Sequence, residues 1–128
     1  MNEYTRIKQH LESLHLDEKK ADFIGKVNCA VLHLMKGGNA DIPNIASYLM
    51  MPISRFRRNV QRSVGLSPAK YVMYVRLQYG LQMFANQRRS SISEVAYECG
   101  FFDHSHFTHT FVRFFGVTPS VFLSQEGK

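Results

Sequence analysis

One stretch of this sequence occurs twice, and this repeat limits the possible folds more than any other feature. Residues 41–68 read DIPNIASYLMMPISRFRRNVQRSVGLSP, and residues 91–119 read SISEVAYECGFFDHSHFTHTFVRFFGVTP. Fifty positions separate three matching residues, which are Ile42, Ile45 and Ala46 in the first copy and Ile92, Val95 and Ala96 in the second. After one inserted residue the offset is fifty-one, and it relates Ser54, Phe56, Val60, Arg62, Val64, Gly65 and Pro68 to Ser105, Phe107, Phe111, Arg113, Phe115, Gly116 and Pro119. The chain therefore contains two copies of one folding unit.

Each copy is predicted to be a short helix, a tight turn and a longer helix. The first copy begins at Asp41, a suitable N-cap, and its longer helix opens at Pro52. In the second copy, Ser91 and Glu94 form a capping box, and the longer helix starts at about His104. A glycine ends each longer helix, and an alanine in each short helix allows close helix packing. This is the layout of a helix-turn-helix, whose second helix enters the major groove of DNA.

Three further helices are predicted outside the repeat. Apolar residues at helical spacing indicate helices over 4–16, 22–35 and 68–86, and no segment has the pattern of a strand. The fold class is therefore all-α, with about seven helices and two helix-turn-helix subdomains in tandem. Helix 68–86 is on the order of 28 Å long, so it is a linker that could place two recognition helices in grooves ~34 Å apart. Residues 4–16 are interpreted as a linker remnant, with a small dimerisation seam as the alternative.

The middle of the chain is strongly basic. Between Ile42 and Ser93 the sequence has eight Lys and Arg residues, including Arg88 and Arg89, and no Asp or Glu. Because protein surfaces usually mix charges of both signs, such a segment is best tolerated when a partner supplies the anion, as DNA phosphates do. Double-stranded DNA is the expected partner. The alternatives are a non-specific nucleic-acid binder and a basic protein-interaction module that meets an acidic protein.

Candidate DNA-binding residues in the first copy lie opposite the apolar side chains of Phe56 and Val60. They are Ser54, Arg55, Arg57, Arg58 and Arg62. Arg57 and Arg58 are predicted to read bases, because arginine can bind guanine O6 and N7 through two hydrogen bonds. Arg62 lies farther along the helix and is expected to bind phosphate.

Candidates in the second copy lie opposite Phe107 and Phe111. They are His104, Ser105, His106, His109 and Arg113. This helix is less basic, so it is expected to read fewer bases. His106 and His109 share a helical face and could bridge a metal, but zinc prefers four ligands and Asp103 is the nearest acid, so no metal is predicted.

The remaining sequence features indicate which classes of protein to exclude. No phosphate-binding loop or paired nucleophile and base is present, so the chain is not expected to be an enzyme or to hold a cofactor. Cys29 and Cys99 lie among apolar residues and are expected to be reduced core thiols. Neither a membrane-spanning apolar run nor a signal peptide is found, which predicts a cytoplasmic protein without a membrane partner.

The segment Ser91–Pro119 resembles the signature region of the AraC/XylS family of bacterial transcription regulators, and the likeness extends from about Asp22 to Phe122. The resemblance implies an AraC-type DNA-binding domain over 21–125, preceded by an N-terminal segment or linker remnant over 1–20. Within it, helix-turn-helix subdomains over 22–66 and 90–123 flank the linker helix 68–86. It also implies promoter binding and activation through RNA polymerase. Family members often carry a separate sensor or dimerisation domain, so the chain is expected to be either the C-terminal part of a larger regulator or a short free-standing one.

The resemblance also implies roles for individual residues. Family base-contact positions match Ser54, Arg57 and Arg58 in the first copy and Ser105, His106 and His109 in the second. Arg76 matches an arginine of the linker helix that is expected to be structural. Three residues depart from the family pattern. Pro52 replaces a capping serine, Gly80 replaces an alanine at a propensity cost of up to ~1 kcal/mol, and His109 replaces an arginine, which weakens the case for tight binding by the second copy.

Overall fold

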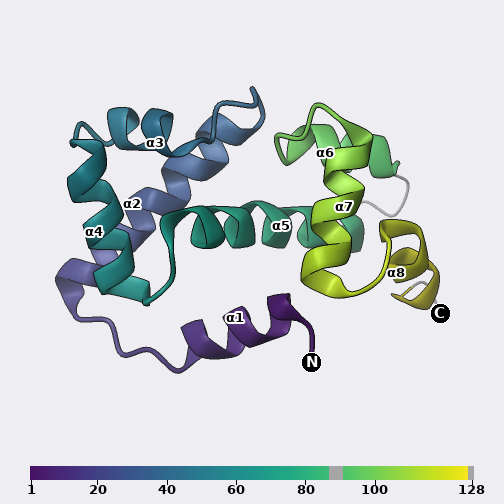
Figure 1. Ribbon diagram of the computed structural model, residues 1–128, viewed down its shortest axis with the longest axis horizontal. Coiled ribbons are helices and arrows are strands. Elements are labelled where there is room, and N and C mark those ends of the chain that lie inside the picture. The colour runs from purple at the N-terminus through teal and green to yellow at the C-terminus, as the bar shows by residue number, and fades with distance from the viewer. Residues whose placement is uncertain (87–90, 127–128) are drawn as a thin grey trace.

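A computed structural model describes residues 1–86 and 91–126, and this part of the chain folds into eight helices without a strand (Figure 1). In chain order they are α1 (Glu3–Glu12), α2 (Glu18–Met35), α3 (Ile42–Tyr48), α4 (Ile53–Val64), α5 (Pro68–Asn86), α6 (Ile92–Glu98), α7 (His104–Phe115) and α8 (Pro119–Glu126). The predicted all-α class with two helix-turn-helix units is confirmed. Arg88 and Arg89 of the basic segment lie outside the described residues.

Helix α8 is the element that the sequence analysis missed. Its first residue is Pro119, just as Pro68 is the first residue of α5. Proline suits this position because the first turn of a helix does not need its N–H group. The repeat therefore includes the helix that follows each recognition helix.

Helix α5 is shared by both copies of the repeat and lies across the centre of the molecule (Figure 1). It contacts α2 and α4 of the first unit and α6 of the second. Its buried residues surround the helix rather than forming one stripe, as expected for a helix covered on all sides. They are Pro68, Tyr71, Val72, Tyr74, Val75, Leu77, Gly80 and Phe84. The Tyr71 hydroxyl donates a hydrogen bond to Asn28 Oδ1 of α2 (2.6 Å), and burial raises the pKa of Tyr71 to about 12.

The N-terminal helices differ from the expected pattern. Helix α2 begins at Glu18, four residues before the predicted start at Asp22, because Asp17 caps it by accepting a hydrogen bond from the Lys20 amide (2.8 Å). Helix α1 packs against α7, and it contributes Tyr4 and Ile7 to the core. The side chains of Tyr4 and Ile7 are therefore buried against other helices of the same chain.

The prediction that both cysteines are core thiols is wrong for one of them. Cys99 is fully buried, and burial raises the pKa of its thiol to about 12. Cys29 is exposed. The buried stripe of α2 passes through Val27 and Val31, and Cys29 lies between these positions on the outer face of the helix.

Gly80 lies where α5 meets the end of α6. A Cβ atom at this position would lie 2.9 Å from Cys99 Sγ, closer than such atoms normally approach. The glycine therefore makes room for the Cys99 side chain, which explains the departure from the alanine of the family pattern.

We predict that Gly80→Ala destabilises the protein, because overpacking costs about 1–3 kcal/mol and outweighs the gain of up to about 1 kcal/mol in helix propensity. In a Cys99→Ala background the same substitution should stabilise. Urea unfolding of the four proteins of this double-mutant cycle measures both effects. An equal gain in both backgrounds would show that the contact with Cys99 has no energetic consequence.

Candidate nucleic-acid interface

The two helix-turn-helix units have the same backbone hydrogen bonds. In the first turn the Met51 amide donates to the Ala46 carbonyl (3.0 Å), and in the second the Phe101 amide donates to the Ala96 carbonyl (2.9 Å). Each turn includes one residue with positive φ, Met50 (58°) and Gly100 (89°). The repeat in the sequence is therefore also a repeat in geometry, and it places α4 and α7 in equivalent positions.

Side-chain caps fix where three of the four helices of these units begin. Asp41 accepts a hydrogen bond from the Asn44 amide (2.9 Å), Ser91 from the Glu94 amide (3.0 Å) and Asp103 from the Ser105 amide (2.9 Å). Pro52 precedes α4 and provides no side-chain cap, as its place in the family pattern implied. The N-terminal amides of α4 therefore lack the side-chain acceptor that caps α7.

Helix α4 presents a cationic face. Phe56 and Val60 have no exposed surface, and the side chains on the opposite side are all exposed. These exposed residues include Ser54, Arg55, Arg57, Arg58 and Arg62. None of the ion pairs found among the described residues includes an arginine of α4. The four guanidinium groups are thus available for an external anion.

Helix α7 presents a less charged face. Phe107 and Phe111 are buried, whereas the predicted residues His104, Ser105, His106, His109 and Arg113 are exposed. Two of them also have neighbours inside the chain. The His106 ring lies edge-on to Phe101, with 5.1 Å between ring centroids. Arg113 lines a hollow together with Glu3 and Lys70, at the end of α7 that faces α1.

Arg76 connects α5 to the turn between α6 and α7. Its Nε donates to the Cys99 carbonyl (2.8 Å), and its guanidinium carbon lies 4.3 Å from the centroid of the Phe101 ring. Burial lowers the pKa of Arg76 from its ordinary value. These contacts support the structural role that the resemblance implied, because they hold the turn that leads into α7.

Two cationic residues were missed by the sequence analysis. Lys19 and Lys20, in the first turn of α2, line a shallow hollow together with Arg62, Asn59 and Phe23. The two lysines stand among acids in the segment DEKK, so their charge gave no clear signal. The fold brings them to the cationic side of α4.

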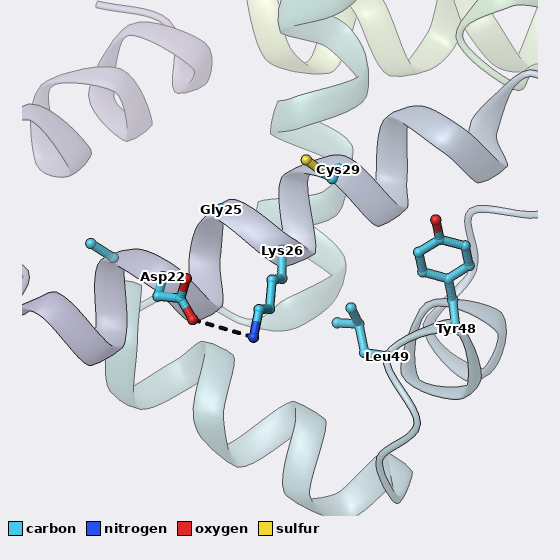
Figure 2. Close-up of a pocket in the computed structure, with 7 residues that line it drawn as sticks. Asp22, Gly25, Lys26, Cys29, Tyr48 and Leu49 are labelled. Carbon is cyan, nitrogen blue, oxygen red and sulfur yellow. Dashed lines mark ion pairs between the residues drawn. The ribbon is translucent and has the colours of Figure 1, made fainter.

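Figure 2 shows a groove between α2 and the end of α3 that is lined mainly by apolar atoms. Its seven lining residues include one acid, Asp22, which is paired with Lys26 at 3.3 Å, and no histidine. Over residues 1–86 and 91–126, no three His, Cys, Asp or Glu side chains gather as metal ligands do, and no helix is long and apolar enough to cross a membrane.

The two recognition helices lie near opposite ends of the shared helix α5 (Figure 1). In Figure 1 both α4 and α7 run from the top of the view to the bottom, so their N-terminal ends lie on the same side of the molecule. Since the N-terminal part of a recognition helix goes deepest into the groove, this arrangement suits two contacts with one duplex.

Comparison with known proteins agrees with this geometry. A family model described as a helix-turn-helix domain matches residues 45–125. The probable transcriptional regulator LumQ of Photobacterium leiognathi is 31% identical over 107 residues, which cover 81% of this chain and 42% of LumQ. The transcriptional activator RhaS of Yersinia pestis (strain Pestoides F) is 29% identical over 83 residues, which cover 65% of this chain and 30% of RhaS. The chain thus spans less than half the length of these relatives, which are named as regulators and not as enzymes.

The fold is also found in a solved structure. A transcriptional regulator of Chromobacterium violaceum, described as having an AraC-type DNA-binding domain, superposes with a TM-score of 0.64 at 24% identity, over 84% of this chain and 97% of that one. Together with the family model, which matches most of the chain, the likeness confirms the resemblance found in the signature segment. The chain therefore belongs to the AraC/XylS family of helix-turn-helix proteins.

Proposed function

We propose that this chain is the DNA-binding module of a transcription regulator and that α4 and α7 enter two successive major grooves of one duplex. The observation that carries the proposal is the pair of equivalent helices, each anchored by a buried stripe and exposed on the opposite face. All ten side chains predicted to contact DNA are exposed. The major groove, about 12 Å wide, admits one α-helix.

The two helices contribute unequally to DNA binding, and α4 makes the stronger contacts. Arg57 and Arg58 of α4 read base edges, and each arginine that binds guanine through two hydrogen bonds contributes about 1–3 kcal/mol of discrimination. Arg55 and Arg62 bind phosphates, together with Lys19 and Lys20, which lie beside Arg62.

Helix α7 contributes a second, weaker half-site. His104, Ser105 and His109 offer hydrogen bonds to base edges, while His106 is partly engaged by Phe101. Arg113 is the one permanent cation of this helix, and it binds phosphate near the helix end.

The regulatory role is a further part of the proposal. RhaS is named as an activator, and we expect the same role here, through contact with RNA polymerase. The longer relatives also have room for a sensor or dimerisation domain outside the matched region.

We predict that Arg58→Ala and Arg62→Ala weaken DNA binding in different ways. Arg58→Ala removes a base contact, so it should cost about 1–3 kcal/mol on the selected sequence and relax the preference at one base pair. Arg62→Ala removes a phosphate contact, so it should weaken binding to every sequence and reduce the salt dependence by about one counterion. Selection from random duplexes, followed by titration at several salt concentrations, measures both effects.

The matched control for this comparison is Lys26→Ala, because the Lys26 ammonium is already paired with Asp22 inside the chain (3.3 Å), and this substitution should leave both quantities unchanged. If all duplexes bind alike in the wild type, the protein is a non-specific binder. If no duplex binds at low salt, the basic face serves a protein partner instead.

A second prediction concerns the unequal charge of the two recognition helices. His109→Arg restores the residue of the family pattern, so it should tighten binding to the selected duplex about tenfold and raise the salt dependence by about one counterion. His109→Gln, which offers hydrogen bonds without a permanent charge, is the control. Unchanged affinity in His109→Arg would show that this position does not face the duplex.

A further inference from the structure

We infer that α1 is a strap that holds the two recognition helices at a fixed separation and thereby sets the half-site spacing that the protein accepts. The inference rests on the proposed function and adds to it a positioning role for His10, Asn2 and Tyr4. No part of α1 lies within the region matched by the family model.

Side chains at the two ends of the strap bind equivalent backbone atoms. His10 Nε2 donates to the Val64 carbonyl at 2.6 Å, and Asn2 Nδ2 donates to the Phe115 carbonyl at 3.4 Å. Val64 and Phe115 occupy the same place in the repeat, because each is the last residue of its recognition helix. The last carbonyls of a helix lack partners within the helix, so they are open to such contacts. One short helix therefore contacts the ends of both α4 and α7.

The glycine after α4 makes room for the His10 ring. Gly65 has a left-handed backbone (φ 71°), and a Cβ atom there would lie 3.2 Å from His10 Nε2. At the equivalent Gly116, a Cβ atom would meet nothing within 4 Å. The close approach at Gly65 is therefore specific to the strap contact and is not a feature of the repeat.

The rest of the strap is attached to α5 and α7. The Tyr4 ring lies 5.0 Å from the Tyr74 ring and 4.8 Å from the Phe115 ring, measured between centroids. Burial raises the pKa of Tyr4 above its ordinary range. Glu3 forms an ion pair with Lys70 at the start of α5 (3.3 Å). The strap is thus fixed at its ends and along its length.

A second set of contacts joins the loop after α2 to the end of α6 and the turn that follows it. Figure 1 shows these segments above α5, whereas α1 lies below it. The Phe102 ring covers Gly38, and Lys36 lies 3.7 Å from Glu98. Two helix-turn-helix units that share only α5 could still rotate relative to one another about that helix. Contacts between the units on both sides of α5 prevent this rotation. Removing the strap leaves contacts on one side alone, so the separation of the recognition helices becomes variable.

A fixed separation has a consequence for DNA binding. A protein preorganised for two grooves loses little freedom when it binds a duplex with the matching spacing, and it discriminates against other spacings. Two extra base pairs turn the second half-site by about 70° around the duplex axis, given about 10.5 base pairs per turn. The strap should therefore matter for the choice of spacing and much less for the recognition of one half-site.

The test compares His10→Ala and Tyr4→Ala with the conservative variants His10→Gln and Tyr4→Phe. Three duplexes are titrated: the selected sequence, the same sequence with two base pairs inserted between the half-sites, and a duplex with only the α4 half-site. The wild type should bind the selected sequence at least about tenfold more tightly than the expanded one. Both alanine variants should reduce this ratio about threefold or more. The conservative variants should retain it, and all five proteins should bind the single half-site alike.

Each outcome decides one question. An unchanged spacing ratio in both alanine variants overturns the strap and leaves the proposed function intact. Loss of single half-site binding in both alanine variants shows a general structural role and also overturns it. Since His10 is exposed and the substitution removes one hydrogen bond, His10→Ala should lower the thermal unfolding midpoint much less than Tyr4→Ala. If the wild type selects no sequence at all, the proposed function itself fails.

Discussion

The attachment of each recognition helix by a single buried face is the interaction on which the rest of the structure depends. Phe56 and Val60 fix α4 in this way, and Phe107 and Phe111 fix α7. Truncating a buried phenylalanine to alanine costs about 3–5 kcal/mol, so the rotational setting of each helix is strongly determined. The same setting that buries these residues leaves the arginines of α4 and the histidines of α7 exposed. Packing and function are therefore two consequences of one helical pattern.

The shared helix α5 turns two small units into one body. Helix α5 follows the first unit and precedes the second in the chain, and it packs against helices of both. Neither unit therefore has a complete core without it. Arg76 then connects α5 to the turn before α7 through Cys99 and Phe101. Further contacts join the two units on both sides of α5. The orientation of α7 relative to α4 therefore depends on contacts from several parts of the chain.

The sequence predicted well what depends on neighbouring residues. The repeat, the caps at Asp41 and Ser91 and the glycine after each long helix placed α3, α4, α6 and α7 within about a residue of their observed bounds, closer than is usual for helix ends. Local signals failed where one residue type serves two purposes. Pro119 could end one helix or begin the next, and Cys29 has apolar neighbours along the chain although it lies off the buried stripe of α2.

Contacts between distant residues could not be predicted in this way. Nothing near His10 in the sequence indicates the carbonyl of Val64, fifty-four positions away. The grouping of Lys19 and Lys20 with Arg62 likewise depends on how α2 crosses α4. From the sequence, Gly80 is only a residue of low helix propensity in the linker helix. The contact with Cys99, which gives the glycine a packing role, is visible only in the fold. Such pairings come from the packing of helices as units, and a periodic pattern within one helix has no information about them.

The central claim is that two equivalent helices occupy successive major grooves of one duplex. Guanine N7 lies in the major groove, so methylation of the selected duplex with and without the protein tests this most directly. We expect two protected patches on one face of the duplex, about ten base pairs apart between their centres, with stronger protection at the α4 half-site. A single patch, or even protection along the whole duplex, would contradict the account.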